Sequence, residues 1–125
     1  MVQGRDLMIT LITLLLVKHF IWDFWYQPPY MWQNKGTFMH PGGIVHSLTH
    51  ALTTLVILLF FDPAAAGILA AFEFVVHYLT DYAKMNINRI KGWGATTHNE
   101  FWQLTGFDQL VHQLTYVVII WVVVK

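Results

Sequence analysis

Residues 6–26 read DLMITLITLLLVKHFIWDFWY, an apolar run whose polar side chains gather toward its far end. About 20 mainly apolar residues are enough for an α-helix to cross the hydrocarbon core of a bilayer. Pro28 and Pro29 follow this run, and neither can continue a helical hydrogen-bond ladder. The stretch therefore predicts a transmembrane helix with a polar end.

Three more apolar segments of similar length follow, near residues 43–61, 64–84 and 100–124. Four spans of this kind predict an all-α integral membrane protein, a four-helix bundle with up-down-up-down topology. We expect residues 1–125 to form a single transmembrane domain.

Two local motifs predict where helices begin. Asp62 can cap the third helix while Pro63 occupies its first position, so the second and third helices form a tight antiparallel hairpin. Thr97 and Glu100 have the spacing of a capping box and predict the start of the last helix.

The composition supports a membrane protein and excludes several other classes. Hydrophobic residues make up 56% of the chain and charged residues 11%, and the mean hydropathy is +0.49. The formal net charge is zero with neutral histidines, and no basic patch is present, so we expect no nucleic-acid partner. The absence of cysteine excludes disulfides, iron–sulfur clusters and thiolate zinc sites.

The distribution of basic residues predicts the orientation in the membrane. The segments on the side of the two longer loops carry four of them and the opposite side carries two: Lys35, Lys84, Arg89 and Lys91 against Arg5 and Lys125. By the positive-inside rule we expect a multi-pass protein of the cell inner (cytoplasmic) membrane with the long loops in the cytoplasm. Its partner is the lipid bilayer, and the sequence leaves oligomerisation open.

Each predicted helix carries one pair of residues that can bind metal, spaced four apart. The pairs are His19 and Asp23, His46 and His50, His77 and Asp81, and Asp108 and His112. Residues at this spacing lie on one helix face, about 5–6 Å apart. In an up-down-up-down bundle all four pairs lie near the long loops, so eight nitrogen and oxygen ligands fall at one level.

This arrangement is typical of dinuclear metal sites in helical bundles. Imidazole with carboxylate suits zinc, manganese or iron, and the excess of Asp over Glu favours a hydrolytic site. Three alternatives remain open: a metal-free polar or proton-relay network, unrelated cross-bundle hydrogen bonds, and haem held by two histidines from facing helices.

Three flanking residues are candidates for a catalytic role. Glu73 lies one turn before His77 and is either an acid/base carboxylate or a buried, protonated group. Lys84 is either a substrate-phosphate ligand or an interfacial lysine in an ion pair. Gln27 follows Asp23 by four residues, where orienting a ligand by hydrogen bonding is the alternative to direct participation.

Other polar residues near the pairs are expected to have supporting roles. Gln109 and Gln113 flank the last pair and can hydrogen-bond to its members. Lys35 offers the same two alternatives as Lys84. His40 and His98 fall in loops, where we expect them to be solvated.

The order of the polar motifs resembles a bacterial and phage membrane family catalogued as domain of unknown function 3307. The motifs that carry this resemblance are His19-x-x-x-Asp23-Phe24-x-x-Gln27, Lys35, the histidines of the second segment, His77-x-x-x-Asp81-x-x-Lys84 and Asp108-Gln109-x-x-His112. The resemblance covers nearly the whole chain and implies a four-helix membrane protein without an assigned activity. A looser likeness to inner-membrane metal-dependent hydrolases, which also set His and Asp on short membrane helices, is an analogy only.

Two functions are consistent with these residues. The first is a metal-dependent hydrolase that acts on a lipid or lipid-linked phosphate or ester at the membrane interface. The alternative is a non-enzymatic accessory, metal-ion or proton pathway protein that uses the same cluster. A pathway requires polar residues across the membrane, and beyond Glu73 the far half of the bundle is almost purely apolar, which favours the hydrolase.

Overall fold

The computed structural model describes residues 2–125, which are helical apart from short links. The main elements are α1 (Val2–Phe20), a π-helical turn η1 (Ile21–Trp25), the short α2 (Pro29–Trp32), α3 (Pro41–Leu59), α4 (Pro63–Lys91) and α5 (Asn99–Val124). Across these described residues the chain contains no β-strand. The all-α prediction is confirmed.

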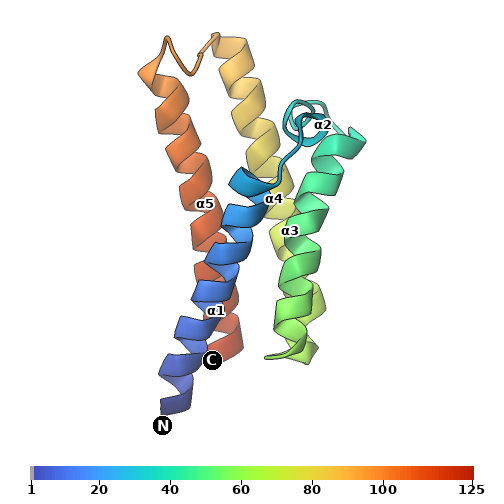
Figure 1. Ribbon diagram of the computed structural model, residues 1–125, viewed down its shortest axis with the longest axis vertical. Coiled ribbons are helices and arrows are strands. Elements are labelled where there is room, and N and C mark those ends of the chain that lie inside the picture. The colour runs from blue at the N-terminus through green and yellow to red at the C-terminus, as the bar shows by residue number, and fades with distance from the viewer. Residues whose placement is uncertain (1) are drawn as a thin grey trace.

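The long helices form an up-down-up-down bundle. α1 packs against α5 and α3 packs against α4, while α1 also contacts α3 and α4 contacts α5 (Figure 1). Both chain ends and the α3–α4 turn lie at one end of the bundle, and α2 and the α4–α5 loop lie toward the other (Figure 1). Four segments are long and apolar enough to cross a membrane: Gln3–Trp25, Pro41–Leu59, Pro63–Lys91 and Asn99–Val124.

The junction between α3 and α4 follows the sequence prediction. The Asp62 side chain accepts a hydrogen bond from the Ala65 backbone N–H at 3.2 Å, and Pro63 occupies the first helical turn. At the other end, Gly92 adopts a left-handed conformation with φ +69° and terminates α4. α4 is thus longer than the expected 64–84, because its polar last turns remain helical up to Lys91.

The predicted capping box before α5 is wrong. α5 begins at Asn99, and among the described residues its N-cap His98 makes no capping side-chain hydrogen bond. The Thr97 hydroxyl instead lies 2.8 Å from His98 Nδ1 and 3.4 Å from the Gly94 carbonyl oxygen. These local contacts in the loop replace the reciprocal bonds that a capping box needs.

Other boundaries also differ from the predictions. α1 begins at Val2 and ends in the π-helical turn, whereas one continuous helix over 6–26 was expected. α3 begins at Pro41, because proline is tolerated in the first turn of a helix. The short helix α2 was not predicted.

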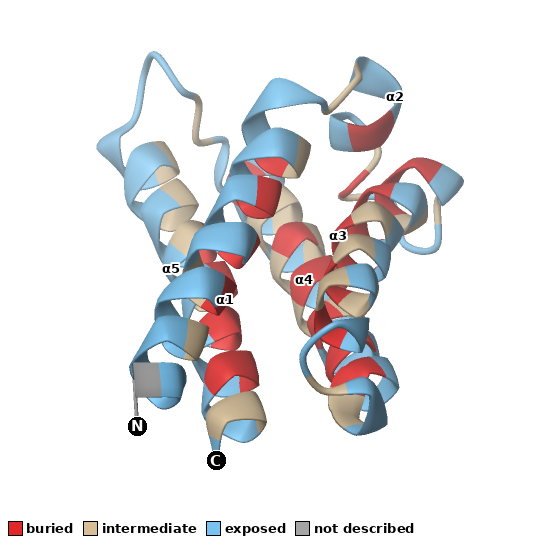
Figure 2. Cartoon of the chain, turned by 60° about the horizontal axis from the view of Figure 1, so that its bottom comes forward, coloured by how far each residue is buried: buried red, intermediate tan, exposed pale blue. Residues whose placement is uncertain are grey.

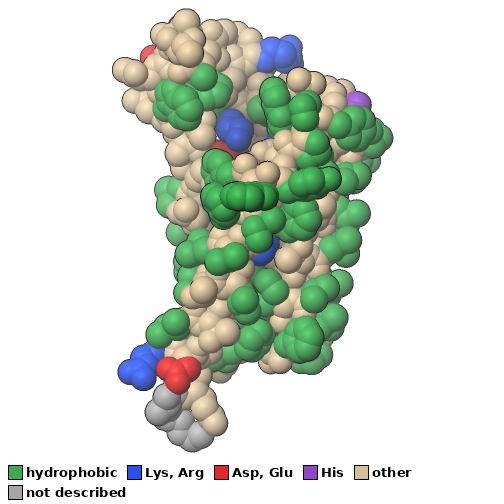
Figure 3. All heavy atoms as spheres, in the orientation of Figure 1, with side chains coloured by type: hydrophobic (Ala, Val, Ile, Leu, Met, Phe, Trp, Pro, Cys, Tyr) green, Lys and Arg blue, Asp and Glu red, His purple; other side chains and the backbone are tan. Residues whose placement is uncertain are grey.

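The inner faces of the four long helices are buried and their outer faces are apolar. Buried residues line the surfaces that the helices turn toward one another (Figure 2). Near the chain ends these residues form an apolar core: Leu11, Leu15, Leu58, Ala66, Leu69, Tyr116, Ile119 and Ile120. Hydrophobic side chains are spread over the middle of the face seen in Figure 3, whereas an acidic and a basic side chain protrude at its lower end. An apolar surface of this extent fits the acyl region of a bilayer.

Candidate metal centre

Three histidines from α3 and α4 converge on the buried carboxylate of Asp23, which lies in the π-helical turn. Asp23 Oδ1 lies 2.8 Å from His50 Nε2, 3.0 Å from His46 Nε2 and 3.7 Å from His77 Nε2. His46 and His50 come from the first turns of α3, and His77 comes from the middle of α4. Three long segments that are distant in sequence thus direct their polar atoms to one point.

A second group forms around Asp81, one turn after His77 on α4. Asp81 Oδ2 lies 3.2 Å from His77 Nε2, and Asp81 Oδ1 lies 3.2 Å from His112 Nε2 of α5. His46 Nε2 is 3.4 Å from the same Oδ2 atom and 3.1 Å from His77 Nε2. The two groups share His77 and form one continuous cluster across the four helices.

The spacing and chemistry of these atoms fit a divalent cation. Ligands bound about 2.0–2.2 Å from one tetrahedral ion lie about 3.3–3.6 Å from each other, and the contacts to the two carboxylates range from 2.8 to 3.7 Å. The buried Asp81 Oδ2 atom lies 3.2 Å from His77 Nε2, 3.3 Å from Lys35 Nζ and 3.4 Å from His46 Nε2, but makes no well-aligned hydrogen bond within residues 2–125. Asp108 Oδ1 is also buried and finds no hydrogen-bond partner in the described chain. Buried oxygens of this kind are normally satisfied, and a cation would satisfy them.

The other two predicted ligands lie at the edge of the cluster. His19 Nδ1 is 2.9 Å from the Tyr116 hydroxyl, and His19 Nε2 is 2.7 Å from Gln109 Oε1 and 3.3 Å from Asp23 Oδ2. Asp108 Oδ2 is 3.2 Å from Lys84 Nζ and 3.4 Å from His112 Nε2. Both residues therefore contact the cluster without belonging to either compact group.

Lysine side chains surround the carboxylates more closely than the sequence suggested. Lys35, from the link between α2 and α3, is buried and lies with its Nζ atom 3.3 Å from Asp81 Oδ2. Lys84 is mostly buried and pairs with Asp108. Both lysines thus form ion pairs in the structure, which is one of the two alternatives considered for each of them.

A polar layer beneath the cluster joins Glu73 to two residues that were not predicted from the sequence to belong to the site. Lys18 forms a buried ion pair with Glu73, and the Thr54 hydroxyl donates to the same carboxylate. Lys18 Nζ also lies 3.2 Å from His50 Nδ1, the ring nitrogen that faces away from Asp23. The sequence did contain a sign of this layer: Lys18 lies within an apolar span, where the charge of a lysine requires a partner.

The placement of Glu73 and Gln27 points to supporting roles. Glu73 Oε2 is 3.9 Å from His50 Nδ1, on the side of the ring that is remote from the centre. The Gln27 amide donates to the Asp23 backbone oxygen and thereby closes the π-helical turn. Glu73 thus pairs with Lys18 and only approaches a predicted ligand, whereas Gln27 contacts the backbone of one.

Comparison with known proteins gives a family but no activity. The model of the family described as protein of unknown function (DUF3307) matches residues 11–125. The chain belongs to this family. No curated protein and no solved structure matches the chain. The family match covers all the polar residues of the cluster, so any function assigned to the chain has to be argued from this site.

Proposed function

We propose that this member of the family is a membrane-embedded, metal-dependent hydrolase that acts on a lipid or lipid-linked phosphate or ester at the membrane interface. The observation that carries the proposal is the convergence of histidine Nε2 atoms from α3, α4 and α5 on two buried aspartates. Histidine and aspartate together suit zinc, manganese or iron.

The cluster has enough ligands for two ions. Asp23, His46, His50 and His77 could together hold one ion. Since His77 Nε2 can bind only one ion, we assign Asp81 and His112 to a second ion, with Asp108 as their third partner.

The proposed chemistry follows from this donor set. Held by these residues, a divalent ion would activate water and polarise a phosphoryl or acyl group. Hydrolysis then adds the hydroxyl of water to the phosphorus or acyl carbon and gives the proton to the leaving oxygen. Glu73 and Gln27 would orient His50 and Asp23, and Lys84 would contact a phosphate group. Among these side chains, Gln27 and Lys84 lie nearest the end of the bundle that carries the long loops, where water and lipid head groups would be accessible, whereas Glu73 lies deeper, beneath the cluster.

The core below the cluster favours an enzyme over an ion or proton pathway. The polar layer of Lys18, Glu73 and Thr54 forms the deepest polar part of the site. Below it, fully buried apolar side chains close the bundle, including those of Leu11, Leu58 and Ile119. A pathway would require polar groups or water to continue through this layer.

The experiment that tests the proposal is an activity assay in lipid nanodiscs. Metal-loaded protein is incubated with phosphatidic acid, a prenyl diphosphate, a phospholipid and a simple acyl ester, and released phosphate, alcohol or fatty acid is measured. We expect turnover of at least one substrate, and we expect Asp23→Asn and Asp81→Asn to abolish it. Failure to hydrolyse every member of the panel, or full activity in both variants, would contradict the proposal.

A further inference from the structure

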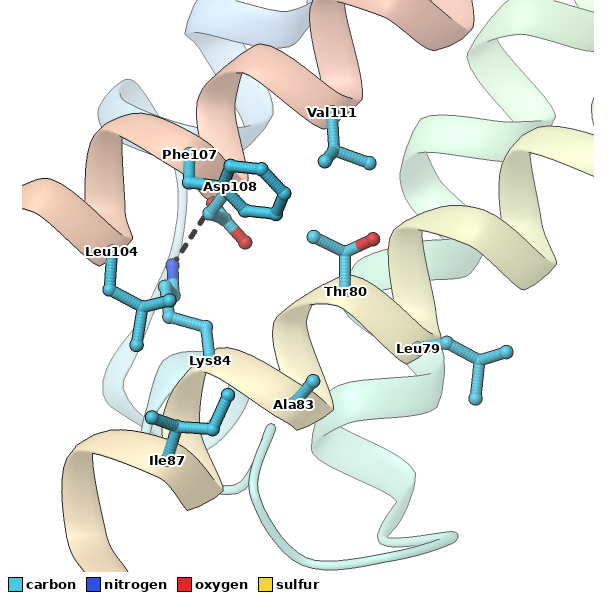
Figure 4. A pocket seen from close by; sticks show the side chains of 9 residues that line it. All are labelled: Leu79, Thr80, Ala83, Lys84, Ile87, Leu104, Phe107, Asp108 and Val111. Carbon is cyan, nitrogen blue, oxygen red and sulfur yellow. Dashed lines mark hydrogen bonds and ion pairs between the residues drawn. The ribbon is translucent and has the colours of Figure 1, made fainter. Parts of the chain in front are cut away.

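A groove between α4 and α5 opens on the outer, lipid-facing side of the bundle. It has a volume of about 270 Å³. Apolar side chains form most of its wall, and two charged side chains lie within it (Figure 4). The lining residues are Leu79, Thr80, Ala83, Lys84, Ile87, Leu104, Phe107, Asp108 and Val111.

The charged part of the groove adjoins the metal centre. Lys84 from α4 and Asp108 from α5 face each other across the groove, with Lys84 Nζ 3.2 Å from Asp108 Oδ2 (Figure 4). The same Asp108 oxygen lies 3.4 Å from His112 Nε2, a member of the cluster. A molecule seated in the groove would therefore have one end beside the proposed ions and the remainder against apolar side chains.

With metal bound, the charge of the site favours an anionic occupant. Lys18, Lys35 and Lys84 contribute +3, and Asp23, Glu73, Asp81 and Asp108 contribute −4, so these groups sum to −1 with neutral histidines. One divalent ion raises this sum to +1 and two raise it to +3. A net positive charge inside a membrane protein is costly unless an anion compensates for it.

We propose that this groove is the lateral entrance for substrate: it seats the apolar chain of an anionic membrane lipid, and Lys84 binds the phosphate of its head group. The inference rests on the proposed function and specifies its substrate as a phosphate-bearing amphiphile taken from the bilayer. Lys84 can bind the phosphate by exchanging its contact with Asp108, which releases that carboxylate toward the second ion.

A second groove on the same bundle provides the control. It lies between α3 and α4, has a volume of about 320 Å³ and is lined only by apolar residues, among them Ala71 and Phe74. Without a charged side chain, this larger groove can accommodate acyl chains but cannot select a phosphate head group. Ala71→Phe and Ala83→Phe are therefore matched substitutions, since each adds the same bulk to a different groove.

The test measures lipid binding and metal content in the same samples. Purified protein is titrated with phosphatidic acid or phosphatidylcholine, bound lipid is counted by native mass spectrometry, and metal is quantified separately. We expect Ala83→Phe and Lys84→Met to weaken phosphatidic acid binding at least about tenfold, equivalent to about 1.4 kcal/mol, with metal retained. Ala71→Phe should bind as the wild type does, and inorganic phosphate should compete weakly.

Two results would overturn the inference: equal binding of the two lipids by the wild type, or unchanged phosphatidic acid binding in both groove variants. Selective, groove-dependent binding of phosphatidic acid by metal-loaded protein that hydrolyses no lipid of the assay panel would support the entrance and contradict the hydrolase, so failures of the two proposals are distinguishable.

Discussion

Lys18 and Glu73 form an ion pair with both side chains almost fully buried within the spans. Removing one member of a buried pair leaves the other charge uncompensated, which costs about 3–5 kcal/mol in proteins. We expect Lys18→Met and Glu73→Gln each to lower the free energy of unfolding by an amount in this range, measured by titration with a denaturing detergent. The double variant should lose much less than the sum of the two. Additive losses would show that the two charges do not stabilise each other.

At the level of single residues, the sequence predicted which side chains could bind metal better than it predicted their contacts across the bundle. The spacing of four between His77 and Asp81 was sufficient to place both on the inner face of one helix, and the structure has them 3.2 Å apart. The sequence could not indicate that Lys18 would reach Glu73, because that contact joins α1 to α4 across the bundle and depends on the rotation of each helix. Tyr116 was missed for the same reason, since its hydroxyl meets His19 across α1 and α5.

Among the secondary-structure elements, the junction of α2 with α3 has no room for one additional atom at Gly42. A Cβ at Gly42 would lie 2.1 Å from the Tyr30 carbonyl oxygen, so α2 would have to move. The same link carries Lys35, whose ion pair with Asp81 would be disturbed. We expect Gly42→Ala to lower both the melting temperature and the metal content.

Gly106→Ala is the control for this substitution. Gly106 lies within α5, and a Cβ there would meet nothing within 4 Å. Alanine is more favourable than glycine inside a helix by roughly 0.5–1 kcal/mol, so this variant should be at least as stable as the wild type. If the Gly42→Ala and Gly106→Ala variants have the same melting temperature, the close approach between α2 and α3 does not restrict the fold.

Local sequence motifs predicted some elements and failed for others, for physical reasons. The Asp62 cap depends on contacts within one turn, so it can be read from the sequence. The π-helical turn has no such local motif. It places Asp23 between His46 and His50, and we attribute it to this tertiary contact.

For the whole molecule, four apolar spans and the position of the prolines were sufficient to predict the bundle and its topology. The orientation in the membrane is a further prediction from the basic residues, with the long loops in the cytoplasm and both ends of this chain outside. A C-terminal fluorescent protein that folds only in the cytoplasm should remain dark, whereas a C-terminal reporter enzyme active only outside should be active. The reverse pattern would contradict the orientation.

Metal should also stabilise the whole bundle, because its proposed ligands come from all four long helices. A ligand that binds only the folded state stabilises it by about 4 kcal/mol when its free concentration is 1,000 times Kd. We expect a strong chelator to lower the melting temperature and the return of the metal to restore it. An unchanged melting temperature after verified metal removal would favour a metal-free hydrogen-bond network.

The most direct test of the account is the metal content of the purified protein, measured by elemental mass spectrometry. We predict at least one zinc, manganese or iron ion per wild-type chain. His50→Ala, His77→Ala and Asp81→Ala should each reduce that content, whereas His98→Ala, in the exposed α4–α5 loop, should not. A wild-type protein that stays free of these metals after incubation with each of them, or a His77→Ala variant with wild-type metal content, would contradict the account.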